Sequence, residues 1–557
     1  VKSKTGELLT SAEQQLRRWE EHFKEVFSPD HGGEDIEELF ASAGRLLPDL
    51  DIAISDAPPS EAEMRKAVQE LKNGKAPGVD NIPPEVLKVD IDTTVRLLLP
   101  VLQRVWNEEV IPEEWKKGLI IKIPKKGDRT CCDNGRGITL LTMASKVLAK
   151  IILGRVKDRI EGLLRKEQAG FRRNRSCVDL INTLRIILEQ SLEWQSPLYA
   201  LFIDFQKAFD SISREAMWKA LQVYGVPPKI LRLIQKMYDG FTCQVIHDGA
   251  LTSDITIQTG CRQGCVMSPT IFLVVLDLLM RMTIGRRKRG IQWGMHDRLE
   301  DLDYADDVCL LAQRFSDMTH KLERLSEFSS KAGLKINVRK TKEIRINVPL
   351  RGPLVVDGGS IERVDSFQYL GSNVDTQGGA DGDIKSRIRK ANGSFVQLYP
   401  VWKNRNISLG TKLRLFNTNV KSVLLYGCET WKVTVVLSRK IQAFVNRCLR
   451  RILGVWWPEV ISNEALWART KQSPIATDIR KRKWKWIGHT LRKNEDSVER
   501  RALDWNPQGS RRIGRPRKTW RRSVEEEASS AGKTWSGIKV LARDREEWRN
   551  FTQALCS

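Results

Sequence analysis

The chain contains 557 residues, 41% of them hydrophobic, and its 93 Lys and Arg against 69 Asp and Glu give a formal net charge of +24. This length and composition predict several globular domains with cores of ordinary size. No signal peptide is visible and no apolar run approaches the 18 residues that a membrane span needs, so we expect no membrane segment. The ten cysteines form no Cys-x-x-Cys pair, which predicts reduced thiols, an intracellular location and no zinc knuckle.

The positive charge is concentrated in the last third of the chain. Residues 1–380 carry 55 Lys and Arg against 53 Asp and Glu, whereas residues 381–557 carry 38 against 16. A basic segment next to a nearly neutral body indicates that a polyanion is held beside that body. The chain begins with Val1 and not with Met, which suggests a fragment of a longer product.

The first 200 residues predict helices alternating with strands. The spacing of apolar residues predicts helices over residues 13–26, 61–71 and 145–164, a strand within 115–126 and a buried strand over 198–203. Ser60 and Glu63 have the spacing of a capping box at the start of the second helix. The acidic stretch 31–57 predicts a linker, and the Gly- and Pro-containing stretch 73–80 predicts a turn.

Two adjacent acids stand inside an apolar, strand-forming stretch over residues 302–311. The run Tyr304-Ala305-Asp306-Asp307 predicts a β-hairpin that turns near Ala305 and Asp306 and holds both carboxylates at its tip. Adjacent carboxylates in apolar surroundings repel each other, and a divalent cation removes that cost. Taken alone, the stretch is explained equally well by a solvated turn.

A third acid and a Gly-containing loop complete the pattern. Asp204 follows the buried strand and precedes the run Phe205-Gln206-Lys207-Ala208-Phe209-Asp210. The run 260–269 reads GCRQGCVMSP, in which Ser268 can cap a helix over 270–282 and Pro269 suits its first turn.

These runs resemble the motifs of reverse transcriptases. Residues 202–210 are similar to motif A, 262–264 with 268–269 to motif B, and 304–307 to motif C, in the family's order. Further blocks resemble the opening motif of the fingers (73–80), motif D (333–342) and motif E (367–371), so that the resemblance covers roughly residues 71 to 374. The match is nearest to non-LTR, LINE-type retrotransposon enzymes of the RTE kind.

The resemblance implies a right-hand polymerase that works with two Mg²⁺ ions, or with Mn²⁺ as an alternative. By resemblance, Asp204 and Asp306 bridge the two ions and Asp307 makes a weaker or outer contact. Lys340 matches the lysine of motif D, a candidate general acid for the leaving pyrophosphate, although a plain basic strand explains it nearly as well. We expect Asp210 to be structural.

Two cations match the positions at which the family contacts the triphosphate of a dNTP. They are Lys125, at the end of the predicted strand, and Arg136, and a polyanionic substrate needs fixed cations of this kind. A solvated basic hairpin is the alternative. The family usually has an aromatic residue before the arginine, where this chain has Gly135, which puts the rigidity of that loop in doubt but not its charge.

Three residues match positions beside the nucleotide and the templating base. Phe209 lies five residues after Asp204, at the steric gate that excludes a ribose 2′-hydroxyl, although a core aromatic is its other reading. Gln263 and Gly264 are expected against the templating base pair, since glycine permits a close backbone approach.

Basic residues elsewhere predict contacts with nucleic acid. Arg172, Arg173 and Arg175, in a segment similar to a block of the fingers, suit a template backbone, or a solvated face. Eleven of the 17 tryptophans lie beyond residue 400, many beside cations. Such rings stack on bases while the cations bind phosphates, or else they form a small helical core with a solvated basic rim. The residues that we expect to bind nucleic acid here, in phrases similar to the tail of RTE-type enzymes, are Lys483, Trp484, Trp486, Arg515 and Arg517.

The predicted fold is α/β, a right-hand polymerase with a helical basic C-terminal extension. Its expected parts are an N-terminal helix and acidic linker (1–59), fingers (60–197), a palm (198–376), a helical thumb (377–457) and a basic Trp-rich region (458–557). Part of the fingers is expected as an insertion in the palm at about 213–255. The thumb is expected to contain helices within 384–399, 409–425 and 439–453.

The predicted function is copying of retrotransposon RNA into DNA from a DNA primer and dNTPs. The family's usual route is target-primed, in the nucleus, with the cytoplasm as the place of the ribonucleoprotein. The nicking endonuclease would come from a missing N-terminal domain or another protein. The alternatives are a host-adopted, non-catalytic nucleic-acid-binding protein and a group II intron-type maturase.

Overall fold

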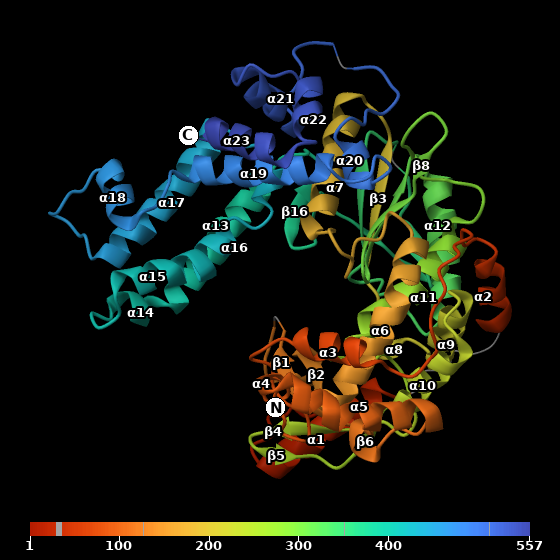
Figure 1. Cartoon of the computed structure of the whole chain (residues 1–557). Coiled ribbons are helices and arrows are strands. Elements are labelled where there is room, and N and C mark those ends of the chain that lie inside the picture. The colour runs from red at the N-terminus through yellow and green to blue at the C-terminus, as the bar shows by residue number, and fades with distance from the viewer. Residues whose placement is uncertain (29–35, 126, 350, 512, 557) are drawn as a thin grey trace. The chain divides into compact units, whose positions relative to one another are not determined.

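The computed structural model describes residues 1–28, 36–125, 127–349, 351–511 and 513–556. They form two compact units. Unit 1 comprises Val1–Arg172, Asp204–Arg287 and His320–Val338, and unit 2 comprises Arg173–Ile203, Lys288–Thr319 and Arg339–Ser557, each within the described ranges. Both units contain helices and strands, which confirms the predicted α/β class (Figure 1). No helix in the described part is long and apolar enough to cross a membrane.

Unit 1 is built around a five-stranded sheet with the order β2-β1-β4-β5, in which β6 also pairs with β4. Its strands are β1 (Lys117–Pro124), β2 (Gly135–Leu140), β4 (Thr242–His247), β5 (Ala250–Leu251) and β6 (Ile255–Thr256). Its helices are α1 (Ala12–Val26), α2 (Ile36–Gly44), α3 (Glu61–Gln69), α4 (Pro84–Val89), α5 (Ile91–Glu108), α6 (Met143–Leu163), α8 (Ala208–Ser211), α9 (Arg214–Val223), α10 (Pro228–Tyr238) and α11 (Ser268–Ile284). Helix α12 (Phe315–Lys331) contains residues of both units.

Unit 2 contains a second five-stranded sheet with the order β14-β11-β3-β10-β9. Its strands are β3 (Leu198–Ile203), β9 (Asp301–Tyr304), β10 (Asp307–Ala312), β11 (Lys342–Ile346) and β14 (Glu362–Arg363), and short pairs are formed by β7 (Ile291–Gln292) with β8 (Arg298–Leu299), β12 (Val355–Val356) with β13 (Gly359–Ser360) and β15 (Ser366–Tyr369) with β16 (Ser372–Asp375). All six residues of β3 are buried, as its unbroken apolar run predicts for a central strand.

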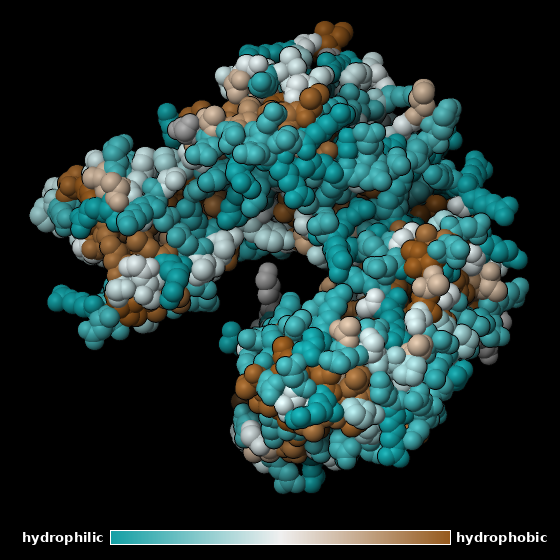
Figure 2. All heavy atoms as spheres, viewed as in Figure 1, coloured by the Kyte–Doolittle hydropathy of each residue, from teal (hydrophilic) through white to brown (hydrophobic). Residues whose placement is uncertain are grey.

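Helices make up most of the remaining part of unit 2. They are α7 (Cys177–Glu193), α13 (Asp381–Gln397), α14 (Tyr399–Lys403), α15 (Leu409–Leu415), α16 (Ser422–Leu424), α17 (Val435–Leu453), α18 (Asn463–Thr470), α19 (Ile475–Leu491), α20 (Val498–Ala502), α21 (Trp520–Ser530), α22 (Trp535–Leu541) and α23 (Arg545–Cys556), with a π-helical turn at Phe416–Lys421. The visible surface of the chain is mostly hydrophilic (Figure 2).

Local signals explain several element boundaries and miss others. Both bonds of the predicted capping box form at the start of α3. Helix α11 begins at Ser268, two residues before the predicted range 270–282. Met267 precedes the helix, and the Ser268 hydroxyl donates to the Arg262 carbonyl at 2.8 Å instead of capping the helix. The predicted acidic linker is wrong over residues 36–44, because the apolar side of that stretch is buried as α2; residues 31–35 of the linker lie outside the described residues. The predicted division into fingers, palm and thumb stays a prediction.

Candidate active site

The hairpin of β9 and β10 holds the adjacent acids of unit 2 as predicted. Asp307 pairs with Tyr304, so the turn consists of Ala305 and Asp306, and Ala305 adopts the left-handed conformation at φ 55°. The strands behind the turn are buried, whereas Asp306 is half-buried and Asp307 is exposed. A tight turn therefore presents two neighbouring carboxylates at the end of a rigid apolar scaffold.

Strand β3 leads directly to the third acid. It pairs with β10 in antiparallel register, with Ile203 opposite Val308. Asp204 is the residue after Ile203, and Asp307 is the residue before Val308. Each acid is thus one peptide step, about 3.8 Å between Cα atoms, from a residue of the same strand pair.

The backbone around Asp204 is fixed by a neighbouring segment of unit 1. The Asn337 amide donates to the Asp204 carbonyl at 2.7 Å, and the Gln206 amide donates to the Lys335 carbonyl at 2.9 Å. Phe205 forms an isolated β-bridge with Ile336 between these two bonds. The segment similar to motif A is therefore held by residues of the segment similar to motif D.

The donors present fit a magnesium site that substrate completes. Among the described residues, no group of three or more His, Cys, Asp or Glu side chains could hold a metal ion by itself. Mg²⁺ commonly takes only one or two protein carboxylates and completes its shell with water and substrate phosphates. Two adjacent carboxylates at a hairpin turn have the oxygen chemistry of such a partial site.

Unit 1 brings the two predicted triphosphate contacts together. Strands β1 and β2 pair in antiparallel register, with Ile123 opposite Arg136 and Pro124 opposite Gly135. Lys125 follows directly, and its amide donates to the Asn134 carbonyl at 2.6 Å. Both Lys125 and Arg136 are exposed. The register therefore puts two cationic side chains at the same end of one hairpin, a suitable arrangement for an anion with several charges.

The last residues of the segment similar to motif A contact the loop and the helix of the segment similar to motif B. The Phe209 ring stacks on Phe272 with centroids 4.3 Å apart, and the Cys261 amide donates to the Phe209 carbonyl at 2.7 Å. The Gln263 side-chain amide donates to Asp210 Oδ1 at 2.5 Å. These contacts fix the side chains of Phe209 and Gln263, which the resemblance places near the nucleotide and the templating base. They also fix the side chain of Asp210, which we expected to be structural.

Asp210 has an electrostatic role that its sequence position did not reveal. Burial raises its pKa from 3.8 to about 6, and the hydrogen bond from Gln263 together with the positive charges of Arg136, Lys125 and Lys207 opposes that rise. The carboxylate is therefore close enough to interact with both predicted triphosphate cations. The one signal in the sequence for this interaction with Lys125 and Arg136 was an acid six residues after Asp204.

Arg262 and Gly264, on either side of Gln263, have different structural roles. Arg262 is 2% exposed and donates to the Met237 and Trp115 carbonyls at 2.8 and 3.2 Å, so it is a structural cation. Gly264 has φ 115°, and a Cβ atom there would lie 2.0 Å from the Thr139 carbonyl oxygen. Only glycine fits this approach to β2, and the predicted contact of Gln263 and Gly264 with the templating base pair stays a prediction.

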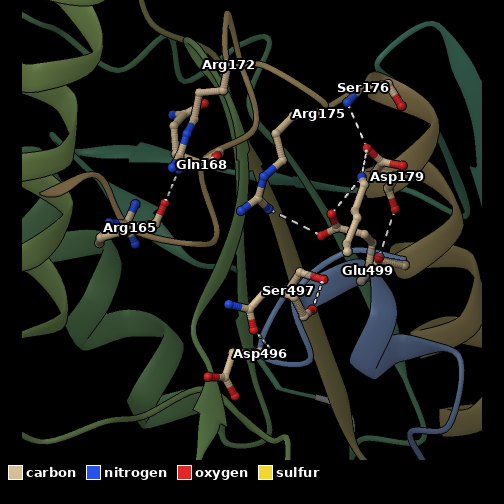
Figure 3. Close-up of polar contacts among 12 residues, drawn as sticks. Arg165, Gln168, Arg172, Arg175, Ser176, Asp179, Asp496, Ser497 and Glu499 are labelled. Atoms are coloured by element: carbon tan, nitrogen blue, oxygen red, sulfur yellow. Dashed lines mark hydrogen bonds and ion pairs between the residues drawn. The ribbon is translucent and has the colours of Figure 1, made fainter. Parts of the chain in front are cut away.

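The predicted template contacts of the arginine segment need correction. In unit 1, the side chain of Arg172 is 6% exposed and pairs with Glu161 at 2.8 Å. It also donates to the carbonyls of Arg165 and Gln168, which lie beside it in Figure 3. In unit 2, Arg175 pairs with Glu499 at 3.3 Å (Figure 3). Internal acceptors already hold these two guanidinium groups, so the structure favours a structural role for both. Arg173 is exposed and stays a prediction.

The predicted contacts of the Trp-rich region need a similar correction. Trp484 and Trp486 are 0% and 9% exposed and donate to Glu527 and Asp179, and Lys483 is 4% exposed and pairs with Glu527. These buried side chains belong to the small helical core that was the alternative prediction. The sequence did not reveal it because two of their partners, Asp179 and Glu527, lie far away along the chain. Arg515 and Arg517 are exposed, as is Lys340 in the turn before β11, and their roles stay predictions.

Comparison with known proteins now identifies the family. Residues 123–374 match the family model described as reverse transcriptase (RNA-dependent DNA polymerase), and residues 394–426 match a domain of unknown function. The chain is 25% identical over 439 residues to an uncharacterised protein of transposon TX1 from Xenopus laevis, covering 78% of the chain and 33% of that protein. It is 23% identical over 472 residues to a probable RNA-directed DNA polymerase from transposon BS of Drosophila melanogaster, covering 80% and 50%.

A third relative comes from a retrotransposable element, R2. The Pol polyprotein of the type-1 retrotransposable element R2 from Popillia japonica is 26% identical over 442 residues, covering 76% of the chain and 59% of that protein. The chain thus spans between a third and three fifths of the length of these relatives. Motifs A to E lie within the matched residues, so the chain contains a reverse transcriptase (RNA-dependent DNA polymerase) domain over residues 123–374.

Proposed function

We propose that this chain copies retrotransposon RNA into DNA by two-metal-ion nucleotidyl transfer, and that it starts from a nicked DNA end at its target. The observation that carries the proposal is the register of β3 with β10, with Ile203 opposite Val308. By resemblance, Asp204, Asp306 and Asp307 are the acids that would act in this reaction. Two Mg²⁺ ions bound by them would activate the primer 3′-hydroxyl and stabilise the leaving pyrophosphate.

The residues of the chain would bind and orient the substrates. Lys125 and Arg136, at one end of their hairpin, would hold the triphosphate of the incoming dNTP. The Phe209 ring, fixed by its stacking on Phe272, would fill the space of a 2′-hydroxyl and so favour deoxynucleotides. Lys340 would give a proton to the leaving pyrophosphate.

The partners of the proposed reaction are an RNA template, a DNA primer and dNTPs. Target-primed synthesis needs a nick, which an endonuclease on a further domain or another protein would make. Such synthesis takes place in the nucleus, where the target DNA lies. The exposed cations Arg173, Arg515 and Arg517 are the candidates for backbone contacts.

Primer extension on an RNA template with dNTPs and Mg²⁺ tests the proposal. We expect DNA product from the parent chain. Asp306→Ala should lower the rate by at least about a hundredfold, since losing even an outer-shell partner of a metal costs 10- to 100-fold. The matched control is Asp365→Ala, an exposed acid elsewhere in unit 2, which should keep the parent rate. Equal rates for Asp306→Ala and the parent would refute the proposal, and template binding without any product from the parent would favour the non-catalytic alternative.

A further inference from the structure

One face of helix α17 is basic and exposed. The helix contains five cations and no Asp or Glu. Four of the cations are exposed, namely Arg439, Lys440, Arg447 and Arg451. The opposite face packs into the hydrophobic core of these helices through Ile441, Phe444 and Leu449, among others. The core thus fixes the orientation of the helix, and the cations on its outer face lie in solvent.

The loop after α17 presents two tryptophans. Trp456 and Trp457 are 56% and 88% exposed. The loop is nevertheless anchored at both ends: Val455 is buried, and Arg450 donates to the Ile461 carbonyl at 3.2 Å and to Asn463 Oδ1 at 2.9 Å. It joins α17 to α18 and projects from these helices of unit 2 (Figure 1). Two large flat rings are therefore held at the surface by a structured turn.

These two rings differ from the other tryptophans of the same region. All eleven tryptophans beyond residue 400 lie in the described part of the chain, and the other nine are buried or half-buried. An exposed indole forgoes the stabilisation that burial of its apolar surface gives. Adjacent exposed rings next to a polar surface mark a site of interaction.

We propose that Trp456, Trp457 and the basic face of α17 bind single-stranded nucleic acid. The indoles would stack on unpaired bases, and Arg447 and Arg451, one helical turn apart, would bind phosphates. Charge favours this partner, because residues 399–471 contain thirteen Lys and Arg against three Asp and Glu. A single strand offers negative charge and flat rings together, whereas a duplex keeps its bases stacked inside.

Binding of a short oligonucleotide to the full chain, without dNTPs or metal, tests the inference apart from polymerisation. The probes are a single-stranded 8-mer and an abasic 8-mer with the same phosphates. Trp456→Ala/Trp457→Ala should weaken binding of the normal 8-mer by about 5- to 150-fold per ring. It should leave binding of the abasic 8-mer unchanged, since stacking is already absent there.

Two further variants separate stacking from loss of structure. Trp456→Phe/Trp457→Phe keeps aromatic rings, so it should bind within about threefold of the parent but lose the quenching of tryptophan fluorescence that stacking causes. Val435→Ala/Val436→Ala, exposed apolar residues at the other end of α17, should bind like the parent. The inference is overturned if the alanine pair binds the normal 8-mer as tightly as the parent, or weakens both 8-mers equally.

Discussion

The burial of the Asp210 carboxyl group predicts an unusual dependence of stability on pH. Burial raises the pKa of Asp210 from 3.8 to about 6. The folded chain therefore keeps this proton over a pH range in which the unfolded chain has lost it, so the free energy of unfolding falls as the pH rises from about 4 to 6. At 1.36 kcal/mol for each unit between the two pKa values, the loss at pH 7.5 is about 3 kcal/mol, an upper value because the side chain is only partly buried.

Asp210→Asn should remove this cost. The amide oxygen can still accept the bond from Gln263, but the side chain cannot ionise. The variant should be more stable than the parent by up to about 3 kcal/mol at pH 7.5 and by only about 1 kcal/mol at pH 4.5. Unit 1 contains about 275 residues, so the gain in its melting temperature should be about 5 °C at pH 7.5 and about 2 °C at pH 4.5.

Thermal melts of the two proteins at both pH values test the prediction. Asp254→Asn, an exposed acid of the same unit, is the matched control and should change the melting temperature little at either pH. A gain of the same size at pH 4.5 and 7.5, or a loss at pH 7.5, would show that the carboxylate does not carry the proposed cost. If the negative charge orients Gln263 for the template base, the more stable variant should also have a KM for dNTPs raised by about tenfold.

Three further substitutions test other parts of the site and its support. Gly264→Ala forces a methyl group against a backbone carbonyl of β2 and should abolish soluble or active protein, whereas Gly154→Ala, in open space on α6, should raise stability by about 1 kcal/mol. Phe209→Ala should raise the incorporation of ribonucleotides relative to deoxynucleotides by about tenfold or more, measured as a ratio that lost stability does not change; an unchanged ratio contradicts the gate. Asp179→Ala should cost about 3–5 kcal/mol in urea unfolding, because it removes the acceptor of Trp486 and Lys493, and Glu495→Ala, an exposed acid, should cost little.

Local patterns predicted the parts of the fold that depend on neighbouring residues. The capping box at Ser60, the six buried residues of β3 and the turn at Ala305 follow from signals within a few positions. The strand predicted within residues 115–126 is likewise present as β1 (Lys117–Pro124). In each case the residues that fix the conformation lie within a single element or its turn.

The tasks of the basic residues could not be predicted in this way, because their partners are remote in sequence. Trp486 donates to Asp179, 307 positions away, and Trp484 donates to Glu527, 43 positions away. A run of Lys, Arg and Trp has the same composition whether its rings are stacked in a core or offered to a base. Only the burial of each side chain distinguishes the two.

The net charge of the C-terminal third therefore overstates how many of its cations are available to bind the phosphates of a nucleic acid. A buried cation needs compensating acceptors, since removing it from water costs several kcal/mol. Unit 2 supplies carboxylates in such pairs as Arg185 with Asp383, Lys483 with Glu527 and Lys493 with Asp179. These cations hold helices together and release no counterions when nucleic acid binds. The salt dependence of binding should accordingly follow the exposed cations of α17 and of residues 515–517, and not the net charge of the region.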